Sequence, residues 1–307
     1  MIVLVNETVV DKHIQAFEVN ALQRILKWLP KDSLVTVPAV HLFDDVANVI
    51  IMDDCGEGVK TLKQLMIDDP SSTDIARQIG AGLGDFLARF HSLGSTDQDA
   101  LDYFDKNHQA KEISAWATYG RLIPTLKGEN APLSMKDPVL DIPSHDLDAI
   151  AQIATQTSSE VMTLKETLVM GDFWPGNILV VWTSDHSAVQ KIYVLDWELV
   201  KPGIAALDLG QFLAEMHLLR RFRPHSAEAS SAVASAFLET YKNVRGAGLD
   251  DLAKRAWVHV GAHLVAWTPR NDWGPKEMTR DVVMEGVGYL LSKGGVAQAE
   301  IAAGLSG

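Results

Sequence analysis

The sequence has few of the features that would place a protein in a membrane or outside the cell. Cys55 is its single cysteine, so no disulfide can form within the chain. The apolar stretches are short: the one at 178–182 ends at Thr183, well before the roughly 18 residues that cross a bilayer. No basic-then-apolar leader opens the chain, because Asn6 and Glu7 interrupt its first residues. These absences predict a cytosolic protein without a membrane anchor.

Basic residues are outnumbered by acidic ones. The chain has 27 Lys and Arg against 40 Asp and Glu, a formal net charge of −13, and such a chain repels nucleic acid unless its basic residues share one face. The densest basic group, Arg220, Arg221 and Arg223, is typical of a solvated helix end. We therefore expect no nucleic-acid partner, and the acidic surface could favour a cationic substrate. The proportions of apolar (47%) and charged (22%) residues are those of a globular protein.

Short β-branched segments and one amphipathic helix account for residues 1–52. Apolar residues Leu22, Ile25 and Leu29 follow helical spacing after Phe17, and Pro30 ends the pattern. The expected strands are 2–5, 8–10, 35–37, 40–43 and 46–52, with a turn at 44–45.

From residue 61 the sequence becomes mainly helical. The clearest helix carries an apolar stripe of Ile75, Ile79, Leu83 and Phe86. Three short strands interrupt the helices, at 167–170, 177–182 and 191–195. The patterns predict an α+β protein with a strand-rich part at 1–52, a hinge at 53–60 and a helical part at 61–307.

Two acids and an amide are placed around these strands as phosphoryl transfer requires. Asp172 precedes the strand that begins near Asn177, and Asp196 closes the next strand, so three oxygen-bearing side chains gather at one end of a small sheet. A carboxylate orients the hydroxyl that is phosphorylated, and magnesium on the nucleotide phosphates takes hard oxygen ligands. The spacing Asp-x-x-x-x-Asn is that of a kinase catalytic loop. Each residue alone would be an ordinary turn or cap residue, and their combination favours the functional interpretation.

The segments MGDFWPGNILV at 170–180 and VLDWE at 194–198 resemble the aminoglycoside phosphotransferase and choline kinase family, in particular its divergent fungal branch. Further similar segments are the helix at 18–22, the strand at 50–53, the helix at 84–91 and Asp208-Leu209-Gly210. The resemblance implies a protein-kinase-like two-lobe fold with a shortened N-terminal lobe and a mainly helical C-terminal lobe. It also implies ATP and Mg²⁺ as cofactors and a small hydroxylated molecule as acceptor.

The resemblance also implies roles for individual residues. Asp172 would be the catalytic base that orients the acceptor hydroxyl, and Asn177 and Asp196 would hold magnesium. Backbone groups of three hinge residues would contact adenine: Asp53, Asp54 and Cys55. Met170 stands where the family commonly has histidine. That histidine is mainly supportive, so the effect on activity should be small.

Glu18 is a further candidate. It is in line with Leu22 and Leu29 on the apolar face of the first helix, where an unpaired charge is costly, so it needs a cation. In kinases that cation is a strand lysine that contacts the α- and β-phosphates, and Lys12 resembles it in its surroundings. Fewer positions separate Lys12 from Glu18 than is usual in the family, so a solvated Lys12 is an equal alternative.

The sequence has no glycine before Gly56, although a kinase small lobe begins with a glycine-containing hairpin over the phosphates. Either the sequence is truncated relative to its relatives or it holds nucleotide weakly. We expect slow ATP-dependent phosphorylation of a small-molecule hydroxyl. The alternative is a catalytically weak or inactive kinase fold that serves as a nucleotide-binding or interaction module. Acceptor-binding side chains are expected within 206–290.

Four other polar residues have less specific interpretations. Glu198 could face the substrate, although a surface or loop-bracing role is simpler. Asp208 is most simply an acid in the first turn of a helix. His259 and His263 share a helical face, but Val260 replaces the glutamate of the zinc-protease motif, so both are interpreted as packing or solvent-facing histidines.

Overall fold

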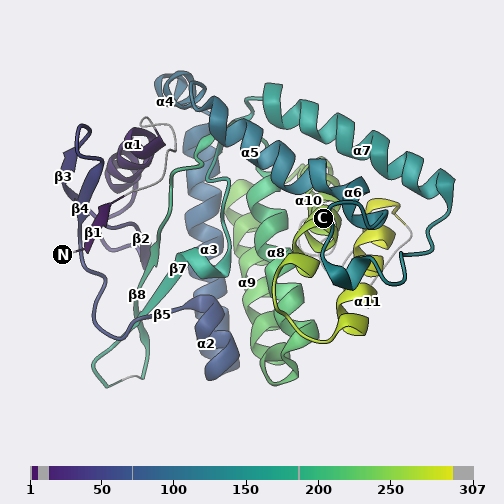
Figure 1. Ribbon diagram of the computed structural model, residues 1–307. Helices are drawn as coiled ribbons and strands as arrows, with labels where there is room; N and C mark the ends of the chain where they lie inside the picture. Colours follow the sequence, from purple (N-terminus) through teal and green to yellow (C-terminus); the bar gives the residue numbers. More distant parts are fainter. Residues whose placement is uncertain (1, 6–13, 71, 186, 293–307) are drawn as a thin grey trace.

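The computed structural model describes the chain except for residues 1, 6–13, 71, 186 and 293–307, and Figure 1 labels its elements. The strands are β1 (Ile2–Val5), β2 (Val35–Thr36), β3 (Val40–Asp44), β4 (Val49–Met52), β5 (Lys60–Thr61), β6 (Thr167–Val169), β7 (Ile178–Trp182), β8 (Val189–Val194) and β9 (Lys201–Gly203). The helices are α1 (Ile14–Trp28), α2 (Leu62–Asp68), α3 (Thr73–Gly94), α4 (Gln98–Phe104), α5 (His108–Thr118), α6 (Leu122–Leu126), α7 (Ser144–Thr163), α8 (Ala206–Phe222), α9 (Ala227–Arg245), α10 (Asp250–Trp267) and α11 (Lys276–Leu290). No helix among the described residues combines the length and apolarity needed to span a membrane.

The first sheet is antiparallel and has the order β1-β4-β3. The expected strand at 46–52 begins only at Val49, which corrects its predicted start. The physical reason is local: the Asp44 carboxylate accepts the N–H groups of Val46 (3.0 Å) and Ala47 (2.9 Å), which bends these residues into a turn, and Asn48 takes a positive φ of 53°. The expected strand at 8–10 lies outside the described residues.

The second sheet joins segments that are distant in the sequence. Its order is β2-β8-β7-β5, in which β2 runs parallel to β8 and the β7–β8 hairpin is antiparallel. The hairpin confirms the pair of strands expected before and after the polar turn. Because β2 and β5 both pair with this hairpin, residues on both sides of the expected hinge contribute to one sheet. The division at 1–52, 53–60 and 61–307 stays a prediction.

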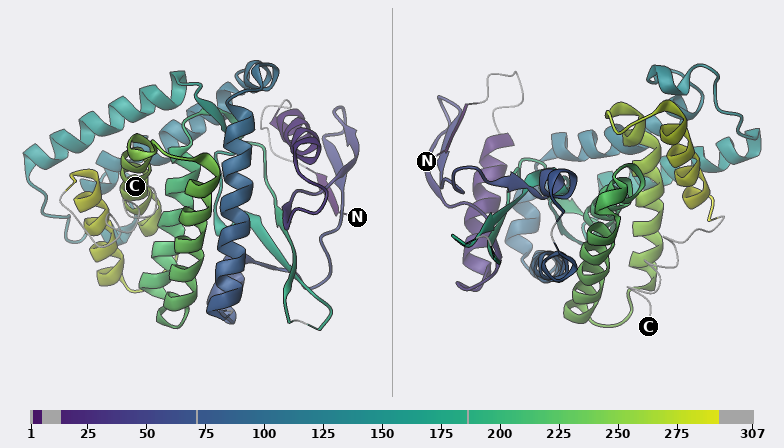
Figure 2. Two further views of the ribbon diagram at one scale, coloured as in Figure 1. Left: turned by 180° about the vertical axis from the view of Figure 1, so that it is seen from behind. Right: turned by 90° about the horizontal axis from the view of Figure 1, so that it is seen from below.

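Helix α3 lies between the strand-rich part and the C-terminal helices, as Figure 2 shows. It packs closely along α9. A Cβ atom at Gly80 would lie 2.2 Å from the carbonyl oxygen of Val233, and one at Gly84 would lie 2.4 Å from that of Phe237. The absence of side chains at these two positions therefore permits the close helix contact.

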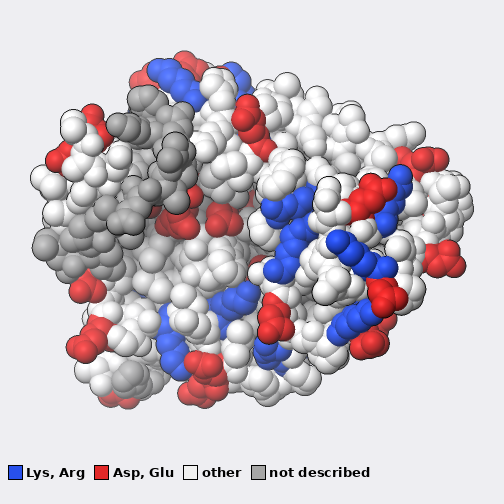
Figure 3. Space-filling view, in the orientation of Figure 1, with Lys and Arg blue, Asp and Glu red and all other residues white. Residues whose placement is uncertain are grey.

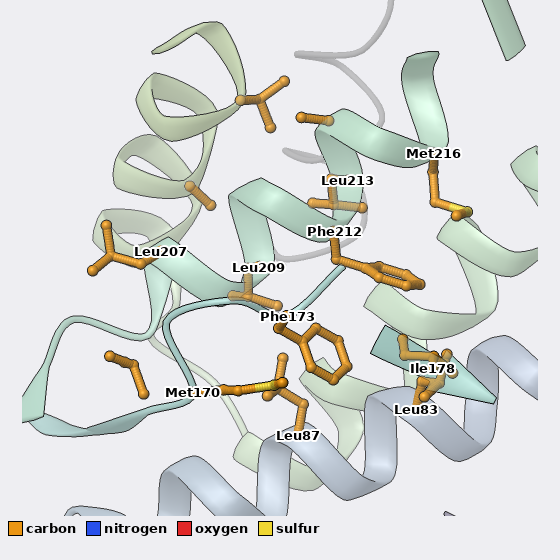
Figure 4. Close-up of a cluster of buried hydrophobic side chains, with 14 of the residues drawn as sticks. Leu83, Leu87, Met170, Phe173, Ile178, Leu207, Leu209, Phe212, Leu213 and Met216 are labelled. Atoms are coloured by element: carbon orange, nitrogen blue, oxygen red, sulfur yellow. The ribbon is translucent and has the colours of Figure 1, made fainter. Parts of the chain in front are cut away.

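A cluster of buried apolar side chains lies beneath the segment that links β6 to β7. Figure 4 shows Met170 and Phe173 pointing into this cluster, towards Leu87 of α3 and Phe212 of α8. The rings of Phe173 and Phe212 are 5.4 Å apart. Burial of a side chain of this size contributes roughly 2–3 kcal/mol to stability. The two apolar anchors fix the segment between them, which contains Gly171 and Asp172.

Candidate active site

Gly171 makes the turn that exposes Asp172. Its φ is +83°, and a Cβ atom there would lie 2.3 Å from Nζ of Lys201 and 2.7 Å from the carbonyl oxygen of Leu199. Only glycine fits both the backbone conformation and the space. The chain then returns to the core at Phe173, so Asp172 is the residue presented by the loop.

Asp208 fixes this loop through hydrogen bonds to its backbone. Its carboxylate is fully buried and accepts the N–H groups of Met170 (2.8 Å) and Gly171 (2.9 Å). It also bonds Nε2 of His91 (3.1 Å), whose Nδ1 bonds the Tyr241 hydroxyl (2.8 Å). Asp208 does lie in the first turn of α8, as the sequence predicts. The sequence did not indicate that the Asp208 carboxylate accepts hydrogen bonds from the loop.

Asp208→Asn should therefore destabilise the protein by about 1–3 kcal/mol, because an amide group in place of the carboxylate leaves one backbone N–H without an acceptor. Asp74→Asn is the matched control, since Asp74 is also a first-turn acid but its side chain is 96% exposed. Urea unfolding of both variants checks this. If the two substitutions cost the same, Asp208 acts only on the helix dipole.

Asp172 is oriented by two amide groups. Its Oδ1 accepts from Nε2 of Gln211 at 2.7 Å and its Oδ2 accepts from Nδ2 of Asn177 at 3.0 Å. Burial raises the pKa of Asp172, and the two amide bonds act in the opposite direction. Gln211 was missed from the sequence. The available signal was its spacing of three from Asp208, which places both on one face of α8.

Asp196 follows a strand that pairs beside Asn177, and its charge acts on Glu18. Leu195 donates its N–H to the carbonyl of Asn177 at 2.8 Å, so Asp196 follows directly beside Asn177. Asp196 has a positive φ of 68°. Burial, then the charges of Glu198 and Asp172, raise its pKa to about 7.

Glu18 completes an acidic cluster with Asp172, Asp196 and Glu198. Burial, then the charges of Asp196 and Glu198, raise the pKa of Glu18 to about 7, although the Trp197 N–H opposes this shift. The structure thus places Glu198 in the cluster rather than on the surface, and burial followed by the charge of Asp172 raises its pKa. Figure 3 shows acidic atoms in the hollow beside the grey residues. Carboxylates held together in this way favour a bound cation.

The donor atoms fit a magnesium ion. Asn177 directs its amide nitrogen to Asp172, which leaves the amide oxygen as its ligand atom, and Asp196 adds a carboxylate. Magnesium prefers such oxygen ligands and takes others from water and phosphate. No group of three or more His, Cys, Asp or Glu side chains suited to a metal ion occurs in the part of the chain that the structure describes. The protein would therefore supply only part of the coordination.

The nucleotide-binding residues predicted from the sequence are only partly described. Lys12 lies outside the described residues, so its pairing with Glu18 stays a prediction. The backbone N–H of Asp53 already donates to Ala39 (2.9 Å), so it is engaged within the sheet. Asp54 and Cys55 follow it, and burial raises the pKa of the Cys55 thiol to about 11. Contact of these hinge residues with adenine stays a prediction.

A cavity of about 150 Å³ opens beside Asp172. Helices α5, α8 and α10 form most of its wall. The lining residues are Ile113, Ser114, Ala117, Thr118, Gly171, Asp172, Leu199, Leu207, Gln211, His259, His263 and Trp267. The expected region 206–290 supplies one side of the cavity. The α5 side was not predicted, because nothing in the sequence of that helix marks a site.

The two histidines of α10 are buried, so the packing interpretation is confirmed and the solvent-facing one is wrong. His259 bonds the Tyr119 hydroxyl at 2.7 Å, and burial, then the charge of His263, lowers its pKa to about 3, so it is neutral. His263 bonds Glu215 at 3.0 Å, which also pairs with Lys63 at 3.3 Å. Both histidines also line the cavity, which the sequence did not indicate.

Lys201 is fully buried beside Gly171, and its Nζ donates to the carbonyl of Leu199 at 3.1 Å. Burial lowers its pKa to about 8, although the charges of Asp208 and Asp172 oppose the shift. The folded pKa lies below the ordinary value of 10.5, so between these values the unfolded chain binds more protons than the folded protein. Lys201 therefore adds stability as pH rises through this window.

Lys201→Met should remove this dependence. Between pH of about 8 and about 9.5, the free energy of unfolding of the wild type should rise relative to that of the variant by roughly 1.5 kcal/mol. Urea unfolding of both proteins at the two pH values measures the difference. Parallel changes in wild type and variant would contradict the prediction.

Comparison with known proteins identifies the family. The model of the phosphotransferase enzyme family (APH) matches residues 12–253. The chain belongs to this family. It is 33% identical over 259 residues to a 4-hydroxytryptamine kinase of Psilocybe cubensis and 34% identical to one of Psilocybe cyanescens. Each match covers 83% of this chain and 66% of the relative, so the chain spans slightly less than two thirds of the length of these relatives.

Solved structures of phosphotransferases share the fold. The streptomycin–ATP–APH(2″)-IIa ternary complex has a TM-score of 0.51 at 13% identity, covering 94% of this chain and 86% of that chain. Choline kinase LicA from Streptococcus pneumoniae has a TM-score of 0.50 at 13% identity, covering 94% and 85%. The predicted α+β, protein-kinase-like fold of the aminoglycoside phosphotransferase and choline kinase type is therefore confirmed.

Proposed function

We propose that the protein transfers the γ-phosphoryl group of ATP to a hydroxyl of a small molecule bound in the cavity beside Asp172. The observation that carries the proposal is the position of Asp172. Its carboxylate lines the cavity and also belongs to the acidic cluster, whose members have no lysine or arginine ion pair among the described residues. Acceptor and cation would thus be brought to the two sides of one carboxylate. The reduced state expected of Cys55 is consistent with a cytosolic reaction.

Asp172 would accept the proton of the acceptor hydroxyl as that oxygen bonds to the γ-phosphorus of ATP, while the bond from this phosphorus to the β,γ-bridging oxygen breaks and ADP leaves. Gln211 and Asn177 hold the carboxylate in one orientation, which would keep the hydroxyl in line with the phosphate. Burial raises the pKa of Asp172, which makes it a better proton acceptor than an exposed aspartate. Asn177 and Asp196 would hold Mg²⁺, which neutralises charge on the phosphoryl group. Glu18 would orient a lysine on the nucleotide phosphates, with Lys12 as the candidate.

The acceptor we propose is a hydroxylated aromatic compound. A cavity of about 150 Å³ accommodates one small ring system, and Trp267, Ile113 and Leu199 give it an apolar lining. Two relatives are named 4-hydroxytryptamine kinase, and 4-hydroxytryptamine is a hydroxylated aromatic amine. The identity of about a third supports the class of acceptor rather than that one compound.

Transfer of labelled γ-phosphate from MgATP to a panel of hydroxylated aromatics, alkyl alcohols and amino sugars tests the proposal. We expect the hydroxylated aromatics to be labelled, slowly. Calorimetry with this chain should show MgATP binding with Kd of about 0.1–1 mM. A folded protein that binds no MgATP at millimolar concentration would reject the enzyme and leave the alternative, an interaction module with a kinase fold.

A further inference from the structure

Arg121 and Arg270 share neighbours around Trp267 and Thr125, and neither has a carboxylate partner among the described residues. Arg121 sits 4.2 Å from the ring centre of Trp116 and 5.1 Å from that of Trp267. Arg270 donates to the Thr125 hydroxyl at 2.9 Å and to the carbonyl of Ala266. Burial lowers the pKa of both arginines, and the charge of Arg121 lowers that of Arg270 further. The two guanidinium groups repel each other, since both stay charged.

Both arginines are one turn beyond residues that line the cavity. Arg121 follows Ala117 and Thr118 by four and three positions, and Arg270 follows Trp267 by three, which are helical spacings for a shared face. Trp267 links the two sites directly: it lines the cavity, and Arg121 stacks near its ring. Trp116, on the outer side of Arg121, is 61% exposed. The arginine pair is therefore next to the Trp267 side of the cavity, one helical turn beyond its lining residues.

Arg121 and Arg270 place two positive charges near the cavity of a chain whose net charge is −13. With a net charge of −13, carboxylates are abundant, yet none pairs with Arg121 or Arg270 in the described structure. Figure 3 shows a band of lysine and arginine atoms beside the hollow. An anion placed between the two guanidinium groups would remove their repulsion and would accept hydrogen bonds from both.

We propose that Arg121 and Arg270 form a binding site for an oxyanion carried by the acceptor. The inference rests on the proposed function, because it assigns residues next to the same cavity. The acceptor would have its reacting hydroxyl at Asp172, an aromatic ring in the cavity and a carboxylate or phosphate at the far end. Arginine suits this role because its planar fork matches both oxyanions. The net negative charge of the chain could favour a cationic acceptor. The two arginines next to the cavity instead favour an anionic one.

Four phenols that share one ring and differ at the far end test the site: tyramine (cationic), tyrosol (neutral), phloretate (carboxylate) and the phosphate ester of the alkyl hydroxyl of tyrosol. Binding is measured by calorimetry without nucleotide. We expect phloretate or the phosphate ester to bind about 10-fold more tightly than tyrosol and tyramine. The tighter of the two anionic probes identifies the oxyanion. Equal binding of tyramine and both anionic probes would overturn the proposal.

Arg121→Gln should abolish the preference for the anionic probes and leave the affinity for tyrosol unchanged, whereas Arg121→Lys should keep part of the preference. Arg77→Gln is the control, because Arg77 is an exposed arginine of α3 paired with Asp74 at 3.7 Å. A loss of affinity for all four probes in Arg121→Gln would instead indicate a packing role. If anion preference and its loss in the variant are seen but no probe is phosphorylated, the proposed function fails and the anion site stands.

Discussion

Asp172→Asn is expected to lower kcat for phosphoryl transfer by about 10³-fold, within the range that a general base contributes. The asparagine cannot accept the proton of the acceptor hydroxyl. It also presents an NH₂ group to one of the two amide donors, Gln211 at 2.7 Å or Asn177 at 3.0 Å, so the side chain loses one orienting bond. Affinity for MgATP should stay within about twofold, because the substitution removes an interaction used in the transition state. Labelled phosphate transfer and calorimetry measure the two effects.

Gln211→Leu is the graded control for this experiment. It leaves the carboxylate and its bond from Asn177 but removes the bond to Oδ1, so kcat should fall by only about tenfold through loss of positioning. An Asp172→Asn protein that retains more than a tenth of wild-type kcat would show that Asp172 is not the base. The proposed reaction would then need a different proton acceptor.

Asp196→Asn is expected to abolish detectable transfer and to stabilise the protein without nucleotide. The loss of activity follows from the loss of a carboxylate that would hold magnesium. The gain in stability follows from the pKa of about 7, which burial and the charges of Glu198 and Asp172 produce. A carboxyl with a raised folded pKa binds its proton more tightly in the folded state, so stability falls as pH rises from about 4 to about 7. At pH of about 8 the variant should therefore be more stable than the wild type, by an amount that solvent screening of the exposed Asp196 reduces.

Asparagine is the appropriate substitution because Asp196 has a positive φ of 68°, a conformation that asparagine tolerates and alanine does not. Glu198→Gln is the control: it also removes a charge from the cluster but no proposed magnesium ligand. It should stabilise the protein and retain activity. Urea unfolding at pH of about 5 and about 8 and transfer assays separate the effects. Loss of stability in Asp196→Asn at the higher pH would contradict the proposed repulsion.

The residues that could be predicted from the sequence are those joined by local geometry. Asp172 and Asn177 are separated by one loop, and Asp196 follows the strand that pairs with the one after Asn177, so a hairpin suffices to bring them together. Helical spacing likewise placed Glu18 on the buried face of α1. The positive φ of Asp196 depends on backbone detail that neither pattern contains. The turn expected at 44–45 is present but extends to Asn48, which the sequence did not indicate.

The residues that could not be predicted act across long sequence distances. Gln211 bonds Asp172 from 39 positions away, and His91 bonds Asp208 from 117 positions away. The α5 wall of the cavity meets His263 and Trp267 only after the helices have packed. Each of these side chains has an ordinary local context, and its role follows from which helices become neighbours.

Because β2 pairs with β8, the acidic cluster can form only after β8 has been synthesised. Lys191 of β8 donates to the carbonyl of Ser33, just before β2, at 2.7 Å, and the two residues are 158 positions apart. A growing chain therefore makes β2 long before its partner strand exists, and the closure of so long a loop is slow. Until β8 emerges, β2 has an unpaired edge that can bind other chains.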